Sequence, residues 1–344
     1  MQTIKTLLST TARRYLTSLL CAMLLAGALP ISAQTAERDK VSVRLKWLAQ
    51  AQFAGFYVAQ EKGFYRNNQL EVTINPGGPN INVETLVASG ADTFGLAGGM
   101  ESVLTAREKG LPVVALAMSQ QRTPFVFVTY DDSGIHSFKD FKGKKVSVWF
   151  TGVQYPLLAS LGQVGLSKND ITLIPQSVSL NPFIDKQVDV ATVTLYNEYN
   201  TLKEKGVTNL RLISPDDVGV TTQQDALITS KAVIEKDPAL VQRFVNATLE
   251  GWQYALTHRA ETLDILMKAN PGLNRPHQQA MLDSVAQLMY PEGSPGLGSV
   301  NLEQAEKMMN LLVKYGALKQ PVDINQTFDL SFWQNVPAGY KTLN

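Results

Sequence analysis

Residues 41–78, VSVRLKWLAQAQFAGFYVAQEKGFYRNNQLEVTINPGG, decide the fold class because strand and helix patterns alternate in them. Val41–Leu45 alternates apolar and polar residues, which predicts a first strand. Ala54–Lys62 is typical of a helix, and Gly63 is placed to end it. Leu70–Ile74 is a second strand that runs into a turn cluster of proline and glycine. This order predicts a β-α-β unit with parallel strands.

The alternation continues along the chain and then gives way to helices. Two α/β units followed by a mainly helical C-terminal part predict an α/β protein with two lobes. We expect lobe 1 to comprise residues 41–128 and 225–344 and lobe 2 residues 129–224, with crossings near Val128 and Asp225. Ligands usually sit in such a cleft, at the carboxyl ends of strands. Further strands are expected at 93–97, 112–118, 125–130, 146–150, 171–174, 188–194 and 226–229, and helices at 83–88, 101–109, 155–164, 183–186, 238–258, 260–269, 277–289 and 302–315.

The first 33 residues have the pattern of a secretory signal peptide. Basic residues come first, an apolar run at 16–29 follows, and Ala33 supplies a small residue for cleavage. The apolar run is shorter than the roughly 20 residues of a membrane span, so an uncleaved anchor helix is the less favoured alternative. Cys21 lies inside the apolar run, and Leu20 stands where a small residue should precede a lipidated cysteine. Both features disfavour a lipoprotein anchor. We therefore expect a mature protein in the periplasm.

Composition excludes several classes of protein. The 344 residues include 31 basic and 30 acidic side chains, and this balance disfavours a nucleic-acid binder. A single cysteine rules out disulfide scaffolds and cysteine-ligated metal centres. The three histidines, His136, His258 and His277, form no metal-binding motif. No GxSxG, Walker or GxGxxG motif is present, so neither a cofactor nor a metal is expected.

Six short motifs, in a fixed order, carry a resemblance to a known family. Together they resemble solute-binding proteins for nitrate, alkanesulfonates, taurine and thiamine-precursor pyrimidines. The resemblance covers most of the mature chain and implies a two-lobed periplasmic-binding-protein fold, type II-like, with mixed, mainly parallel sheets. It also implies a monomer that closes on a small molecule and delivers it to the permease of an ABC importer. The motifs are LKW (45–47), AGFYVAQEKGFY (54–65), AREKGLPVV (106–114), DFKGKKV (140–146), QVDVA (187–191) and WQYAL (252–256).

The loops after the first three strands supply candidate ligand contacts in lobe 1. Trp47 follows the first strand and could stack on a flat ring, or cap the sheet as a core residue. Gln50 and Gln52 could read an amide or heteroaromatic edge, or simply be solvated. Phe53 is a second stacking face or a core plug. The other candidates are Gly78 and Asn80, which also suit a plain turn, and Gly98, Gly99 and Glu101, where a helix begins and where Glu101 could instead satisfy the helix dipole.

Two loops supply the candidates in lobe 2. Trp149, Thr151, Gly152 and Tyr155 lie between a strand and a helix. Tyr196, Asn197 and Glu198 follow the strand at 188–194. The resemblance implies that a carboxylate and aromatic groups near this position grip an aminopyrimidine in the thiamine-precursor binders. A carboxylate suits the donors of such a ring, although a solvated acid at a helix start is the alternative for Glu198.

The residue at position 53 points to a different ligand from that of the pyrimidine binders. Those proteins tend to carry a histidine where Phe53 stands, so we expect a larger or more apolar aromatic ligand, a flavin included. Nitrate and sulfonates fit an acid-bearing site poorly, because carboxylates repel anions. They remain an alternative, as do a sensory partner of a membrane receptor and an enzyme like the fungal thiamine-pyrimidine synthase. The synthase has a cysteine-rich motif that the mature chain lacks.

Overall fold

The computed structural model describes residues 37–343, which form one compact unit from Arg38 onward. The expected signal peptide at 1–33, with Cys21, lies outside the described residues. In the part of the chain that is described, no helix combines the length and the apolar character that a membrane crossing requires.

The first sheet has five strands and confirms the β-α-β prediction. Its order is β2-β1-β3-β10-β4. The three strands β1, β2 and β3 run parallel to one another, whereas β10 is antiparallel to both β3 and β4. The sheet is therefore mixed, and its parallel half comes from the segment that opens the chain. The bounds are β1 Asp39–Arg44, β2 Leu70–Asn75, β3 Phe94–Leu96, β4 Val113–Gln120 and β10 Gln224–Ser230.

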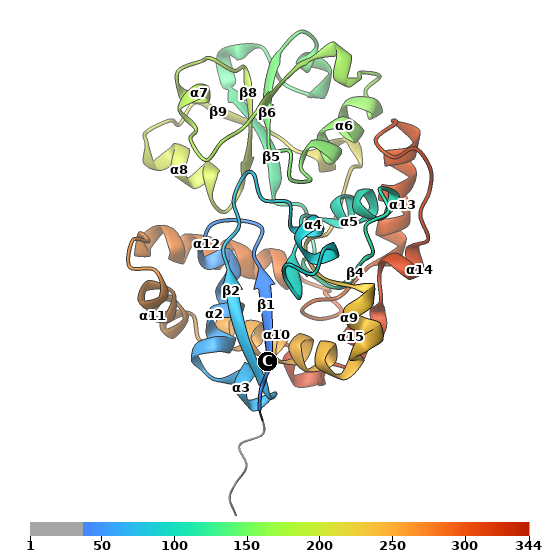
Figure 1. Cartoon of the computed structure of the whole chain (residues 1–344). Coiled ribbons are helices and arrows are strands. Elements are labelled where there is room, and N and C mark those ends of the chain that lie inside the picture. The colour runs from blue at the N-terminus through green and yellow to red at the C-terminus, as the bar shows by residue number, and fades with distance from the viewer. Residues whose placement is uncertain (1–36, 344) are drawn as a thin grey trace, which may run out of the picture. The chain divides into compact units, whose positions relative to one another are not determined.

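The second sheet is built in the same way from the middle of the chain (Figure 1). Its order is β7-β6-β8-β5-β9, with β6 parallel to β7 and β8, and with β5 antiparallel to β8 and β9. The sequence analysis does not predict the edge strand β9, because its four residues are too few to establish a period. The bounds are β5 Phe125–Tyr130, β6 Lys145–Val148, β7 Thr172–Pro175, β8 Val190–Thr194 and β9 Leu210–Ile213.

The chain passes between the two sheets twice, and the first crossing differs from the prediction. β4 belongs to the first sheet and ends at Gln120, whereas β5 belongs to the second and begins at Phe125. The predicted crossing near Val128 is therefore wrong, because Val128 lies inside β5 and pairs with Ala191 and Leu212. An apolar run predicts a strand without saying which sheet it joins. The chain returns between the end of β9 and the start of β10.

Helices cover both sheets, and the C-terminal part is helical as predicted. The longest helix, α10, begins where the sequence signals it: Asp237 accepts a hydrogen bond from the amide of Leu240 at 2.8 Å, and Pro238 opens the first turn. The helices are α2 Ala54–Glu61, α3 Phe64–Asn67, α4 Val83–Ala88, α5 Met100–Glu108, α6 Gln154–Gln163, α7 Asn181–Ile184, α8 Glu198–Glu204, α9 Lys231–Lys236, α10 Pro238–Thr257, α11 Arg259–Ala269, α12 Arg275–Met289, α13 Leu302–Lys314, α14 Ile324–Thr327 and α15 Leu330–Gln334, with the 3-10 turn η1 at Ala51–Phe53.

Two glycines let α10 pack closely on α2, the helix that follows the first strand. A Cβ atom on Gly55 would overlap the ring of Trp252, and one on Gly251 would overlap the carbonyl oxygen of Gly55. Trp252 is 1% exposed and packs edge-on against Phe56, with ring centroids 6.5 Å apart. This contact places the C-terminal helices against the helix that precedes β2, so the two ends of the described chain share one core.

Candidate functional site

A cavity lies among loops that connect strands of both sheets with the elements that follow or precede them. This is the edge at which the carboxyl ends of parallel strands meet, as the sequence predicts. The lining residues are Lys46, Trp47, Gln50, Gln52, Gly98, Glu101, Phe125, Trp149, Thr151, Val153, Thr194, Tyr196, Asn197, Glu198 and Gln224.

Aromatic side chains from both sheets meet in the cavity wall. Trp47 follows β1 and Trp149 follows β6, and their rings meet edge-on with centroids 5.6 Å apart at 69°. Phe125, at the start of β5, lies 6.4 Å from the Trp149 ring. The indole nitrogen of Trp149 donates to the carbonyl oxygen of Ser177 at 3.3 Å, which fixes that ring in place. The half-buried Trp47 leaves part of its surface for a ligand.

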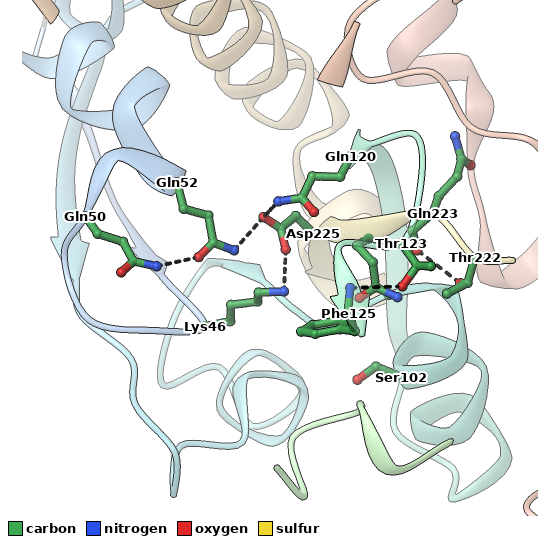
Figure 2. Close-up of polar contacts among 12 residues, drawn as sticks. Lys46, Gln50, Gln52, Ser102, Gln120, Thr123, Phe125, Thr222, Gln223 and Asp225 are labelled. Atoms are coloured by element: carbon green, nitrogen blue, oxygen red, sulfur yellow. Dashed lines mark hydrogen bonds and ion pairs between the residues drawn. The ribbon is translucent and has the colours of Figure 1, made fainter. Parts of the chain in front are cut away.

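A buried carboxylate organises the polar wall on the first-sheet side (Figure 2). Asp225 pairs with the ammonium group of Lys46, and the Asp225 side chain is 1% exposed. Its Oδ2 also accepts hydrogen bonds from Gln52 at 2.8 Å and from Gln120 at 3.0 Å. Gln50 in turn donates to Gln52 at 2.8 Å. The positive charge of Lys46 is thereby neutralised inside the protein.

The backbone of Asp225 adopts an unusual conformation that directs this carboxylate. Its φ of +58° lies in the left-handed region, in a strand whose register also shifts between Leu227 and Ile228. Aspartate tolerates that region better than most residues. The sequence does not indicate this left-handed backbone conformation. The sequence analysis places only the return to lobe 1 near Asp225.

Glu101 forms the second polar centre, and the structure buries it completely. Its carboxylate accepts hydrogen bonds from Thr222 at 2.7 Å, from Gln224 at 2.9 Å and from the Gly99 amide at 3.2 Å. Burial raises the pKa of Glu101, and the hydrogen bonds from Gln224 and Thr222 act in the opposite direction. Glu101 therefore lines the cavity and also accepts a hydrogen bond from a backbone amide at the start of α5.

One acceptor in this wall has no partner within residues 37–343. Gln224 turns its Nε2 to Glu101, and its buried Oε1 accepts nothing there. Because an unpaired buried acceptor costs free energy, a ligand that donates a hydrogen bond to Oε1 of Gln224 would be favoured.

Glu198 is the acidic group on the second-sheet side. It is 7% exposed, so the alternative of a solvated acid at a helix start is wrong. Oε2 of Glu198 accepts from the Thr194 hydroxyl at 2.6 Å and from its amide at 3.0 Å, and Oε1 accepts from Asn197 at 2.7 Å. Burial raises the pKa of Glu198, and the Thr194 hydrogen bonds oppose it. Burial also raises the pKa of the Tyr196 phenol well above its ordinary value.

The structure brings together most of the predicted site residues but leaves six of them outside the cavity lining. Phe53 is a core residue with no exposed surface, so its side chain gives no information on ligand size. Asn80 is exposed beside the buried Gly78, in the turn after β2. Gly99 lies behind the wall, where a Cβ would overlap Gln224. The remaining two are Gly152, which lies against Gly98, and Tyr155, which packs on the core cluster beneath α5.

Sequence reasoning missed five lining residues. Lys46 stands beside the predicted Trp47, and its place at a strand end was the available signal. Val153 adjoins the predicted Gly152, and Thr194 ends the predicted strand two residues before Tyr196. Phe125 and Gln224 lie at the starts of β5 and β10, the two antiparallel strands. Those strands bring their amino ends to the cavity edge, which a rule about parallel strands does not anticipate.

Comparison with known proteins identifies the family. The model of the family described as NMT1/THI5 like matches residues 50–262, which is more than half of the chain. The chain belongs to the NMT1/THI5-like family. The match begins at Gln50 and includes every cavity-lining residue except Lys46 and Trp47.

Two similar relatives are named as binding proteins and a third as an enzyme. The riboflavin-binding protein RibY of Chloroflexus aurantiacus is 28% identical over 88% of this chain and 87% of its own length. A formylaminopyrimidine-binding protein of Halalkalibacterium halodurans is 27% identical over 84% of this chain and 89% of its own. A 4-amino-5-hydroxymethyl-2-methylpyrimidine phosphate synthase of Legionella pneumophila is 24% identical over 72% and 79%.

The solved structures confirm the periplasmic-binding-protein fold. The alkanesulfonate-binding protein SsuA of Xanthomonas axonopodis pv. citri superimposes with a TM-score of 0.66 at 17% identity, and the match covers 86% of this chain and 100% of SsuA. The predicted fold class, two mixed sheets flanked by helices with a helical C-terminal part, is therefore confirmed. At this identity the likeness concerns the fold and not the ligand.

Proposed function

We propose that the protein is an extracytoplasmic solute-binding protein that captures a small, flat, aromatic N-heterocycle, a flavin or a thiamine-precursor pyrimidine. It delivers this ligand to the permease of an ABC importer. The observation that carries the proposal is the pairing of aromatic walls with two buried carboxylates, Glu101 and Glu198, in one cavity. The names of the two binding-protein relatives support the same class of ligand.

The charges of the cavity support a neutral ligand that donates hydrogen bonds. Lys46 is the one basic residue among the described lining residues, and Asp225 already neutralises it. Glu101 and Glu198 leave the wall acidic or, when protonated, neutral. An anion would meet carboxylates and no free cation, whereas the N–H groups of a heterocycle meet acceptors, including Oε1 of Gln224.

Hinge closure is the mechanism that this arrangement supports. The ligand would first stack on Trp47 of the lobe built on the first sheet, and the other lobe would then bring Trp149 and Glu198 over it. Closure removes water from these contacts, so the hydrogen bonds form in a medium of low polarity and strengthen. The two segments that connect the sheets, 121–124 and 214–223, are the proposed hinge.

Titration calorimetry with riboflavin and with its 5′-phosphate tests the ligand class. The two compounds share the ring system, and the phosphate adds up to two negative charges at neutral pH. We expect riboflavin to bind at least about ten-fold more tightly, a difference of roughly 1.4 kcal/mol. Native mass spectrometry of the purified protein extends the test to pyrimidines. Tight binding of an alkanesulfonate with no binding of either heterocycle would refute the proposal and favour the anion alternative.

An enzyme is the second candidate, because the relative from Legionella pneumophila is named as a synthase. Among residues 37–343, no three histidine, cysteine or acidic side chains gather as a metal site. Incubation of the protein with the bound heterocycle, followed by mass analysis, decides between the two. Recovery of the unchanged compound is the expected result, and a chemically altered product would identify an enzyme.

A further inference from the structure

His277 connects elements of the two sheets beside the cavity. It lies in the first turn of α12, a helix that packs against η1 and β4 on the first-sheet side. Its ring contacts α8, which packs against β8 of the second sheet. Nδ1 lies 2.9 Å from Oε1 of Glu204, and Nε2 lies 2.9 Å from Oδ1 of Asn197.

Both ring nitrogens of His277 face oxygen atoms that can accept hydrogen bonds. The carboxylate of Glu204 cannot donate when ionised, and Oδ1 of an asparagine amide never donates. The orientation of the Asn197 amide follows from its other contact, because Nδ2 donates to Oε1 of Glu198 at 2.7 Å. A ring that donates from both nitrogens satisfies both of these acceptors.

The chain of contacts ends at the ligand cavity. Asn197 and Glu198 both line the cavity, whereas His277 and Glu204 do not. Glu198 receives one of its three hydrogen bonds from Asn197 and the other two from Thr194. One of the three hydrogen bonds that hold the Glu198 carboxylate thus comes from an amide that also contacts His277 of α12.

We propose that His277 is a positioning residue, which as an imidazolium latches α12 to α8 and holds Asn197 and Glu198 in place for the ligand. The proposal rests on the proposed function for the identity of the ligand, but not for the latch itself. When pH rises and the ring loses one proton, an acceptor nitrogen faces either Glu204 or Asn197. The two acceptors repel, and the latch opens.

The charges around the ring leave Glu204 as its ionic partner. Neither η1 nor β4 contains a charged residue. On α8, Lys203 lies over the ring of Tyr199 at 4.5 Å, and Glu198 reaches His277 only through Asn197. The charged groups at the contact between α11 and α12 are already paired with each other, Arg275 with Asp264 and Arg259 with Asp283, each at 2.7 Å.

Spin labels on the two helices test the latch without any ligand. The labels are attached at Lys205→Cys and Gln279→Cys, both exposed, in the full chain with Cys21→Ser. We expect a short, narrow label-to-label distance at about pH 5.5 and a longer or broader one at about pH 8, the range over which histidine changes charge. In the His277→Gln background the distribution should not change with pH. An unchanged distribution at both pH values in the unsubstituted background would overturn the latch.

Calorimetry with riboflavin at the same two pH values tests the effect on the site. We expect a roughly ten-fold loss of affinity from low to high pH that is absent in His277→Gln and reduced in Glu204→Gln, which keeps an acceptor but removes the charge. His136→Gln, an exposed histidine, is the control and should retain the pH dependence. An undiminished pH dependence in His277→Gln would refute the positioning role.

Asn197→Asp separates the two halves of the proposal. The aspartate still accepts from His277, so the label distances should keep their pH dependence, but it cannot donate to Glu198 and riboflavin affinity should fall. Unchanged affinity in this variant would show that Glu198 is not positioned through residue 197. If neither riboflavin nor a thiamine-precursor pyrimidine binds at either pH, the proposed function fails, and the label distances still decide whether the latch exists.

Discussion

Asp225→Asn removes the charge that neutralises Lys46 and changes little else. Asparagine has nearly the same shape and also tolerates the left-handed backbone at φ +58°. The ammonium group of Lys46, whose side chain is 14% exposed, would then be buried without a counter-charge. Gln52 and Gln120 would exchange a charged acceptor for a neutral one. We therefore expect a large loss of stability with no change of fold.

The magnitude follows from the burial of the pair. Two unit charges about 3 Å apart attract by roughly 5 kcal/mol at an effective dielectric constant of about 20. Removing one partner of a buried pair typically costs about 3–5 kcal/mol. Lys46 keeps some contact with water. We therefore expect the lower end, a loss of about 3 kcal/mol in the free energy of unfolding.

Urea unfolding followed by circular dichroism measures this loss. Lys46→Met and the double variant with Asp225→Asn complete a double-mutant cycle, which isolates the energy of the pair from other effects of each substitution. We expect Asp225→Asn to be less stable than the double variant, because the latter leaves no uncompensated charge. A loss below about 0.5 kcal/mol for Asp225→Asn, or a coupling energy near zero, would refute this account of the cavity wall.

Three further predictions concern the ligand, the core and the pH dependence of stability. Trp47→Phe should reduce the change in tryptophan fluorescence on riboflavin addition, leaving the part that Trp149 contributes, and should weaken binding. Unchanged affinity would exclude the stacking role. Gly251→Ala should lower the free energy of unfolding by about 1–3 kcal/mol in urea titrations, because its methyl group overlaps the carbonyl of Gly55, whereas Gly339→Ala, with open space around it, should be nearly neutral. Burial raises the pKa of Glu101, so its contribution to stability is fully present below the unfolded-state pKa of 4.5 and is lost as pH rises through the folded-state pKa. Glu101→Gln should flatten this part of the curve of urea midpoint against pH. A curve identical to that of the unsubstituted protein would contradict the prediction.

Element type was largely predictable from the sequence because local patterns carry it. The predicted bounds of the strand Phe125–Tyr130 and the helix Val83–Ala88 agree with the structure residue for residue. Val128 shows the limit of such patterns. Its apolar neighbours require a strand, but pairing with Ala191 and Leu212 is a choice between sheets that local sequence does not encode.

The candidate site was predictable where one rule applies and not beyond it. Trp47, Glu101 and Glu198 lie at strand ends or helix starts, and the carboxyl ends of parallel strands converge in space. Phe53 is aromatic and follows the first strand, as a ligand contact would, yet its side chain packs in the core. The direction of a single side chain in a turn depends on the backbone geometry of η1, which no sequence period reveals.

The α/β class, the helical C-terminal part and the residue types at the cavity edge follow from local sequence, because each depends on neighbours within a few positions. The tertiary structure alone decided that Lys46 meets Asp225 and that His277 meets Asn197 and Glu204. These partners are far apart in the chain, and they meet only when strands and helices from both sheets have packed. The charge and orientation of the cavity groups therefore belong to the folded protein.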